Sequence, residues 1–453
     1  MTSALGRRIV IAGTHSGVGK TTVATGLMAA LAARGQRVAS AKVGPDFIDP
    51  GYHALATGRP GRNLDIWMSG ADAIGPLAGR AAAGADVLVV EGVMGLFDGA
   101  SDGTPSSSAD VAALLEAPVV LVVDAAAMSQ SVAAVVHGFA AVHGGAGGVA
   151  GVILNRVASD GHEVLLRDAL APLGLPVLGA LRREDALEWR DRHLGLVPVA
   201  ERPNEVRAAL ERLAAVVACR CDLEAVLRLA TSAPVRPVAD PATARPVAGR
   251  PRLALAAGPA FTFTYRDNVE ALEAAGAEVV PFDPLADAAL PPAIHGLLVG
   301  GGFPEVYGEA LAANRPLLAD VHRQVTAGLP TWAECGGLLW LARSLDGRPM
   351  AAVIAADAVM TPRLTLGYRE AKVQRSNPLA GVETVVRGHE FHYSQVTPPG
   401  DALQLTSRFG SGPEGHASAT LLATYLHQHL GADPAPAERF VATAERRRTG
   451  EDR

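Results

Sequence analysis

The sequence predicts an α/β protein with two domains, the first built on a doubly wound, mostly parallel sheet. Short apolar runs alternate with helix-length segments along most of the chain, and this alternation is typical of βαβ units. A glycine-rich loop follows the first apolar run. Only 4% of the residues are aromatic while 49% are hydrophobic, which favours parallel strands covered by small-residue helices over an aromatic-rich sandwich.

The first domain is predicted to span residues 1–230. Its expected strands are the apolar runs 8–13, 37–44, 86–93, 118–125, 148–155 and 176–182. A helical stretch follows near 203–230. Five prolines then occur between Pro234 and Pro251, and because proline at this density resists both helix and sheet, we interpret residues 231–250 as a linker.

The alternation resumes after the linker and predicts a second α/β domain over residues 251–445. Its first expected strands are residues 252–258, 277–283 and 295–302. The three arginines at 446–448 are interpreted as part of a solvated tail, 446–453. A chain of 453 residues is long enough for two such domains, and the two share an architecture but no motif.

Composition excludes several classes of function. A net charge of −6 provides no basic field for nucleic acid. The three cysteines are an odd number in a long chain, which indicates a reducing compartment, and we expect a cytoplasmic protein. The stretch from Ala125 to Asn155 carries no charged side chain, yet its polar residues and the GGAGG run at 144–148 argue against a membrane span.

The loop from Gly13 to Thr21 reads GTHSGVGKT and lies between an expected strand and an Ala- and Leu-rich helix. Backbone N–H groups at a helix N-terminus favour an anion, so this loop predicts a site for the phosphates of ATP. Lys20 would reach the β and γ phosphates, and the Thr21 hydroxyl would bind Mg²⁺. The expected ATP-binding residues of the loop are Thr14, Gly17, Val18, Gly19, Lys20, Thr21 and Thr22. The alternative is a glycine-rich turn that only caps a helix.

Acidic residues follow two of the expected strands, at the sheet edge where ligands bind in this architecture. Lys42 lies near the end of one expected strand and is followed by Asp46 and Asp49. Glu91 lies near the end of another and is followed by Asp98. We expect Asp46 and Glu91 to join Thr21 as ligands of Mg²⁺, and Lys42 to neutralise phosphate charge. The alternative for each acid is a helix cap or a loop residue without a ligand.

The loop, together with AKVGPDFIDP and VVEGVMGLFDG, resembles the nucleotide domain of cobyrinic acid a,c-diamide synthases, relatives of dethiobiotin synthetase. The resemblance implies that ATP phosphorylates a carboxylate of a corrin macrocycle and that nitrogen then attacks the acyl phosphate. It also implies that Asn155 reads the adenine base. Substrate contacts are expected at Asp46, Asp49, Tyr52 and Asp98. Partitioning ATPases carry a second lysine where this chain has His15, which argues against a dimer switch.

The segment LPTWAECGGLLWLA places Cys335 between an expected strand and an expected helix. Such a nucleophile elbow exposes a thiol, and the helix N-terminus favours the reactive thiolate. Gly301 and Gly302 end another strand and are expected to form an oxyanion hole. His427 is the expected general base, and if TYLHQHL is extended it shares a face with His429. The alternative for a lone cysteine is a buried apolar role.

The motifs GGFPE, AECGG and YLHxH resemble the class I glutamine amidotransferase domain of cobyrinic and cobyric acid synthases. Two positions depart from that class. Ala333 stands where most members have glycine, and His429 stands where the class has the glutamate of its catalytic triad. The sequence therefore leaves open which residue, if any, orients His427.

Two remaining motifs are not interpreted as metal sites. In HEFH, residues 389–392, the histidines lack the spacing that places both on one face of a helix. We expect this segment to order a domain interface or the tetrapyrrole. Cys219 and Cys221 lie in a helical stretch without a second cysteine pair, so we interpret them as core thiols.

Together the motifs predict a ligase that amidates the a and c acetates of cobyrinate or hydrogenobyrinate in cobalamin biosynthesis, with L-glutamine as nitrogen donor. The resemblance also implies a homodimer. Two alternatives are kept open: an amidating synthetase for another polycarboxylate, and an ATP switch without catalysis. The sequence distinguishes neither the presence of cobalt in the ring nor the order of amidation.

Overall fold

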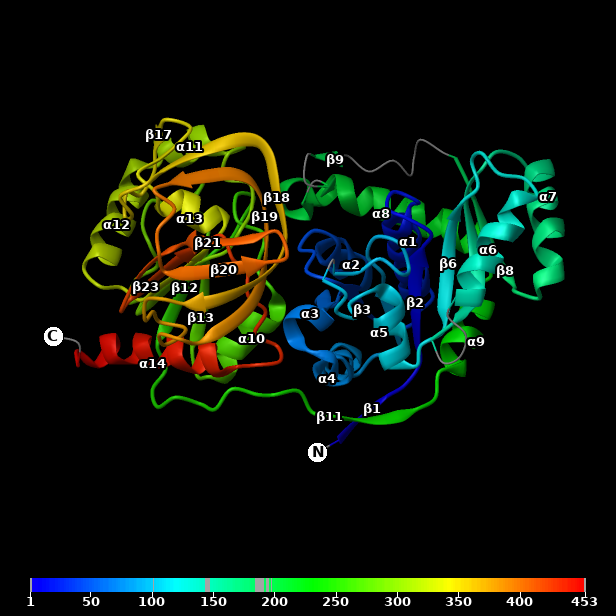
Figure 1. Ribbon diagram of the computed structural model, residues 1–453, viewed down its shortest axis with the longest axis horizontal. Coiled ribbons are helices and arrows are strands. Elements are labelled where there is room, and N and C mark those ends of the chain that lie inside the picture. Colours follow the sequence, from blue (N-terminus) through cyan, green and yellow to red (C-terminus); the bar gives the residue numbers. More distant parts are fainter. Residues whose placement is uncertain are drawn as a thin grey trace. The chain divides into compact units, whose positions relative to one another are not determined.

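The computed structural model describes residues 2–100, 102–142, 147–183, 191–192, 195–196 and 198–451. The chain divides into two compact units, Met1–Pro241 and Ala242–Arg453 (Figure 1). The division falls inside the segment 231–250 that the sequence suggests as a linker. Across the described ranges, no helix combines the length and the apolar character needed to cross a membrane.

The first unit contains a seven-stranded parallel sheet, and the predicted fold class is confirmed. In spatial order the strands are β4 (Arg62–Leu64), β3 (Val38–Val43), β5 (Val87–Glu91), β2 (Arg8–Gly13), β6 (Val119–Asp124), β7 (Val149–Val157) and β8 (Val177–Arg182). Six of these match the apolar runs expected from the sequence. β4 was not predicted, because a three-residue strand has no recognisable pattern.

Helices cover the sheet of the first unit (Figure 1). They are α1 (Lys20–Ala33), α2 (Asp49–Thr57), α3 (Ile66–Ser69), α4 (Ala71–Ala82), α5 (Ser108–Leu115), α6 (Ser131–Val142), α7 (Asp160–Leu170), α8 (Pro203–Arg220) and α9 (Leu223–Ser232). α8 and α9 fill the stretch expected to be helical. The uncharged run from Ala125 forms α6 and β7, and residues 144–146 of its glycine-rich segment lie outside the described residues.

The proline-rich segment 231–250 is not wholly irregular, and the expectation that it resists sheet is wrong for four of its residues. β11 (Arg236–Ala239) pairs antiparallel with β1 (Thr2–Leu5), and Pro237 lies opposite Ala4. Proline is tolerated here because both strands of a two-stranded ribbon are edge strands, so the missing N–H removes no bond from a sheet interior. The expected tail also begins later than predicted, since α14 (Ala435–Thr449) includes the three arginines.

The second unit is built on a six-stranded sheet. Its spatial order is β13 (Glu278–Phe282), β12 (Arg252–Ala256), β14 (Gly296–Val299), β15 (Thr331–Glu334), β23 (Leu421–Thr424) and β22 (His416–Ser418). All neighbours are parallel except β22 and β23. Side chains alternate across this sheet, so Leu297 and Val299 join one apolar cluster and Leu298 joins another on the opposite face.

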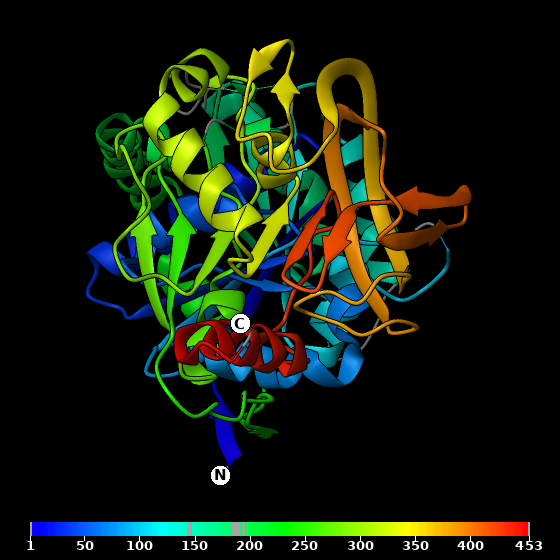
Figure 2. The same ribbon diagram turned by 90° about the vertical axis from the view of Figure 1, so that its left-hand side faces the viewer.

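A second, mostly antiparallel sheet accompanies the first within this unit. Its long ribbon of β18 (Asp357–Val373) and β19 (Val385–Thr397) is the yellow and orange pair in Figure 2. β16 (Ser344–Leu345), β17 (Arg348–Pro349), β20 (Leu403–Ser407) and β21 (Gly410–Glu414) complete it. The helices of the unit are α10 (Arg266–Ala274), α11 (Gly308–Ala313), α12 (Arg315–Thr326), α13 (Gly336–Leu341) and α14.

Candidate active sites

The phosphate-loop geometry follows from its glycines. β2 ends at Gly13, and α1 begins at Lys20. Gly17 and Gly19 have φ angles of 82° and 92°, a left-handed conformation that glycine adopts without steric cost. A Cβ at Gly19 would lie 2.2 Å from the Asn155 side-chain nitrogen, so glycine is required there for space as well. The loop expected from the sequence is therefore formed by strand, turn and helix in that order.

Lys20 is held over this loop. Its Nζ donates a hydrogen bond to the carbonyl oxygen of His15 at 3.0 Å, and only 7% of the residue is exposed. Burial and the neighbouring Lys42 lower the pKa of Lys20 to about 8. The ammonium group thus lies at the N-terminus of α1, where an anion would be favoured.

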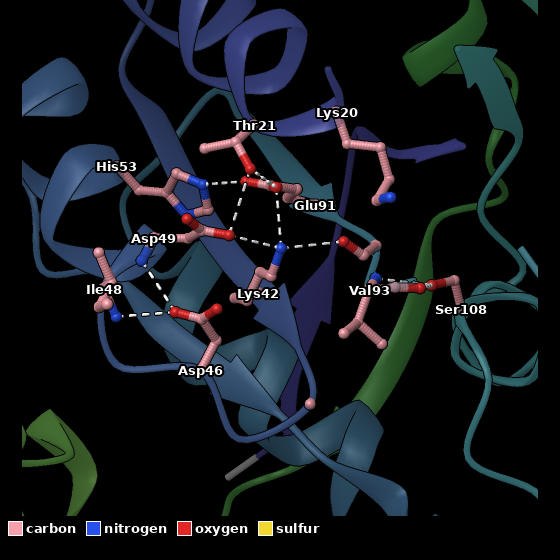
Figure 3. Close-up of polar contacts among 12 residues, drawn as sticks. Lys20, Thr21, Lys42, Asp46, Ile48, Asp49, His53, Glu91, Val93 and Ser108 are labelled. Carbon is pink, nitrogen blue, oxygen red and sulfur yellow. Dashed lines mark hydrogen bonds and ion pairs between the residues drawn. The ribbon is translucent and has the colours of Figure 1, made fainter. Parts of the chain in front are cut away.

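Thr21 lies among carboxylates at the carboxyl ends of the strands (Figure 3). Its hydroxyl donates to Glu91 Oε1 at 2.7 Å and to Asp49 Oδ2 at 3.3 Å. Lys42 Nζ lies 2.8 Å from the same Glu91 oxygen and 2.7 Å from Asp49. The other Glu91 oxygen lies 2.6 Å from His53 Nε2. Burial alone would lower the pKa of Lys42, but the two carboxylates outweigh burial and raise it.

The donors around Thr21 suit Mg²⁺, because one hydroxyl and two carboxylates are hard oxygen ligands. Within the described part of the chain, no group of three or more His, Cys, Asp or Glu side chains is arranged to hold a metal unaided. Phosphate oxygens and water would therefore supply the remaining ligands, as is usual for Mg²⁺.

Asp46 contacts the backbone at the start of α2, and its role as a metal ligand stays a prediction. Its Oδ1 accepts hydrogen bonds from the backbone of Ile48 at 2.7 Å and of Asp49 at 2.9 Å. These two bonds form a turn that leads into α2, whose N-cap is Ile48, and they use one of the two carboxylate oxygens. Asp49, the first residue of α2, lies beside Thr21.

The other residues that were expected to contact ATP or the substrate have different surroundings from one another. Asp98 is exposed, and its Oδ2 accepts a hydrogen bond from the Gly95 backbone at 2.8 Å. Tyr52 is only 2% exposed, so its expected place in a substrate wall is not supported by the structure. Asn155 donates from its side-chain amide to the Val18 carbonyl at 2.8 Å, which ties the end of β7 to the phosphate loop.

Cys335 occupies the predicted elbow of the second unit. It directly follows β15 and precedes α13, and its backbone has φ 48° and ψ −100°. A positive φ at a residue other than glycine is uncommon and marks a constrained turn. The Sγ atom lies 4.0 Å from the Phe391 carbonyl oxygen. A Cβ at Gly337 would lie 2.3 Å from the Val299 carbonyl oxygen, so this turn requires glycine after the cysteine.

The structure brings His427 to Cys335, as the sequence predicts. Burial alone would lower the pKa of His427, but hydrogen bonds to Cys335 and Glu334 outweigh it and raise the pKa to about 10. The Nδ1 atom lies 3.2 Å from Glu334 Oε2. On the other side, the His389 ring stacks on the His427 ring at 4.9 Å between centroids.

Gly301 does not have the role predicted for it. Its N–H already donates to the Phe263 carbonyl oxygen at 3.0 Å, so it is not available to an oxyanion. Gly302 lies nearer the elbow, because a Cβ at Gly336 would stand 3.0 Å from the Gly302 nitrogen. The first N–H groups of a helix have no partner within the helix, so Gly336 joins Gly302 as a candidate donor.

The HEFH segment and His429 lie close to Cys335 and His427. HEFH lies on strand β19, so its histidines follow the alternation of a strand. His389 Nε2 and the Tyr265 hydroxyl lie 2.9 Å apart, and the His429 ring packs on Tyr265 at 4.9 Å between centroids. His429 Nε2 lies 3.7 Å from Asp267, away from the position of a triad acid.

Sequence reasoning missed the contact between Glu334 and His427. The glutamate is visible in the AECGG motif, but the sequence does not reveal that strand β15 brings it to a histidine 93 positions later. Cys221 is buried, as expected for a core thiol, and burial raises the pKa of its thiol to about 12. Cys219 is exposed, so its expected place in the core is wrong.

Comparisons with known proteins cover both units. Residues 9–197 match the model of the CobQ/CobB/MinD/ParA nucleotide binding domain, and residues 252–435 match that of the CobB/CobQ-like glutamine amidotransferase domain. A hydrogenobyrinate a,c-diamide synthase from Streptomyces coelicolor is 50% identical, with 96% of each chain covered. One from Thermobifida fusca is 47% identical, with 97% of each covered. A cobyrinate a,c-diamide synthase from Synechococcus sp. is 41% identical over 96% of this chain and 98% of that one.

Proposed function

The chain belongs to the a,c-diamide synthase family, and on this basis we propose that it amidates the a and c acetates of a corrin macrocycle with glutamine nitrogen. The resemblance found in the sequence is thereby confirmed. The observation that carries the proposal is the presence in one chain of two complementary sites. Lys20 and Thr21 lie at a phosphate loop beside acidic side chains, and Cys335 lies at an elbow beside His427.

In the first unit, Lys20 would bind the β and γ phosphates of ATP, and the loop N–H groups would hold their oxygens. Thr21, Glu91 and Asp49 would hold Mg²⁺, which when bound neutralises charge on the phosphates. A substrate carboxylate oxygen attacks the γ phosphorus and ADP leaves, which gives an acyl phosphate. Ammonia then attacks the acyl carbon, phosphate is expelled, and an amide remains.

In the second unit, His427 accepts the proton of Cys335 while Sγ attacks the side-chain amide carbon of glutamine. The N–H groups of Gly302 and Gly336 would stabilise the oxyanion that forms. His427 then returns the proton to the departing nitrogen. Ammonia leaves, and the glutamyl group stays on Cys335 as a thioester. Water hydrolyses that thioester and releases glutamate.

Hydrogenobyrinate, without cobalt, is the macrocycle that we propose as the substrate. Two relatives named for hydrogenobyrinate are 47% and 50% identical to this chain, whereas a relative named for cobyrinate is 41% identical. Asp49 and Asp98 remain proposed substrate contacts, and Asn155 a proposed contact of the adenine. We further propose that the protein is a cytoplasmic homodimer without nucleic-acid or membrane partners. Light scattering would test the oligomeric state.

Mass spectrometry tests the central proposal. The protein is incubated with ATP, Mg²⁺, glutamine and hydrogenobyrinate or cobyrinate, and we expect the mass shift of two amidations, faster with hydrogenobyrinate. No shift with either macrocycle would refute the substrate assignment. Glutamate release without any macrocycle product would instead direct attention to another polycarboxylate.

A further inference from the structure

We propose that Glu334 is the positioning residue that orients His427 for glutamine hydrolysis, an inference that rests on the proposed function of Cys335. The sequence leaves this role vacant, because His429 stands where a triad glutamate is expected. His429 lies by Tyr265 and Asp267. Glu334 instead approaches His427 from the strand that carries the nucleophile.

The contact has the geometry that an orienting acid needs. Glu334 Oε2 lies 3.2 Å from His427 Nδ1, within the range of an N–H···O hydrogen bond. The side chains are 8% and 1% exposed, so water competes little for this bond. With Nδ1–H donated to the carboxylate, Nε2 is left to exchange the proton of Cys335.

The elbow explains how consecutive residues reach one imidazole. Successive side chains of a strand point to opposite faces, so Glu334 and Cys335 would diverge in a regular strand. Cys335 instead turns out of the strand with φ 48°. β15 also pairs with β23, which places Glu334 beside Thr424. Three residues later, His427 is fixed by a two-way backbone bridge to His389, at 2.9 and 3.1 Å.

Glu334 is itself held by groups that neither react nor titrate. Its Oε1 accepts hydrogen bonds from Trp332 Nε1 at 3.0 Å and from the Gln428 backbone at 3.2 Å. These two bonds fix the rotation of the carboxylate and direct Oε2 toward His427. Fixed second partners of this kind are what hold a catalytic imidazole in one tautomer.

Two other buried carboxylates of the unit, Glu414 and Glu390, have different partners. Glu414 accepts hydrogen bonds from the Thr424 hydroxyl at 2.6 Å and from the Tyr425 backbone at 2.7 Å. Glu390 pairs with Arg369 at 2.6 Å. Within the described part of the second unit, the titratable groups that face His427 include Cys335 and Glu334 from the β15 segment and His389 from β19. Glu334 alone among these three is a carboxylate.

Glu334→Gln tests the assignment, because it keeps the shape of the side chain and removes its charge. Glutamate release is followed with ATP, Mg²⁺ and the macrocycle present. We expect kcat for glutamine to fall about 100-fold with KM nearly unchanged. The limb of the pH–rate profile that reports His427 should move to lower pH, because the imidazolium loses its anionic partner. Ammonia-dependent amidation should stay at the wild-type rate.

Glu414→Gln is the matched control, since it removes a buried carboxyl group whose hydrogen bonds go to Thr424 and Tyr425 and not to His427. It should leave the pH limb in place. Glu334→Asp keeps the charge, so it should lower kcat while the limb stays near its wild-type position, and it serves if Glu334→Gln fails to fold. A Glu334→Gln protein with wild-type kcat and an unmoved limb would overturn the assignment. A wild-type protein that releases no glutamate would instead overturn the proposed function.

Discussion

Gly301→Ala tests how closely the glutamine site is packed around its histidine. A Cβ at this position would lie 2.7 Å from Cε1 of His427 and 3.2 Å from Cβ of Phe263. The first distance is about 0.7 Å shorter than the 3.4 Å at which ordinary van der Waals contact begins. Gly301 is not among the glycines with positive φ, so the backbone itself accepts alanine. The added methyl group must therefore displace the ring.

The expected loss follows from that displacement. A misplacement of about 1 Å in a catalytic group can reduce the rate about 100-fold. A shift of several tenths of an ångström should then lower kcat for glutamine-dependent amidation roughly 10- to 100-fold. Chemistry in the first unit does not use His427, so amidation with added ammonium salt should proceed at the wild-type rate.

The assay compares product formation with glutamine and with ammonia in the same preparation. Gly412→Ala is the control, because a Cβ there would meet nothing within 4 Å, and it should behave as wild type with both nitrogen sources. Equal losses with glutamine and ammonia would indicate a general folding defect. An unchanged kcat with glutamine would refute the argument that ring position limits this half-reaction.

Four further substitutions have defined outcomes. Cys335→Ala should lower glutamate release more than about 1,000-fold yet amidate with ammonia, whereas Lys20→Ala should fail with either nitrogen source; mass spectrometry of the product distinguishes them. Lys42→Met leaves Asp49 and Glu91 without their buried cation, so chemical denaturation should show a loss of about 3–5 kcal/mol. Burial raises the pKa of Glu414 to about 8, so its proton is retained on folding and stability falls as pH rises from about 4.5 to 8. Glu414→Gln should therefore gain up to a few kcal/mol relative to wild type over that window, measured as the pH dependence of Tm.

Local features of the fold could be predicted because their causes are local. The strand, the glycine loop and the helix around Lys20 are each indicated by their own composition, and their order along the chain predicts a phosphate loop. The elbow at Cys335 is similar, since the following glycines are needed within the same turn. Both sites were therefore expected within a few residues of where the structure has them.

Contacts between distant segments could not be predicted in the same way. Which carboxylate reaches Thr21 depends on where α2 begins, and Asp49 is the first residue of that helix and contacts the Thr21 hydroxyl. The glycine run at the end of its strand predicts an oxyanion hole at Gly301, but the N–H of Gly301 donates to the Phe263 carbonyl oxygen. Sequence patterns report composition and period, but such pairings depend on how loops return to the sheet edge.

The short segment around the elbow has a consequence for how this enzyme can be recombined. Trp332, Glu334 and Cys335 are encoded within four consecutive codons. Trp332 donates a hydrogen bond to Glu334, and Glu334 and Cys335 each contact His427. A crossover between related genes can hardly separate the thiol from this carboxylate. An acid placed just after the histidine would instead lie more than ninety codons from the thiol, and a single crossover could exchange it. The segment is thus inherited, and could be transplanted, as one unit.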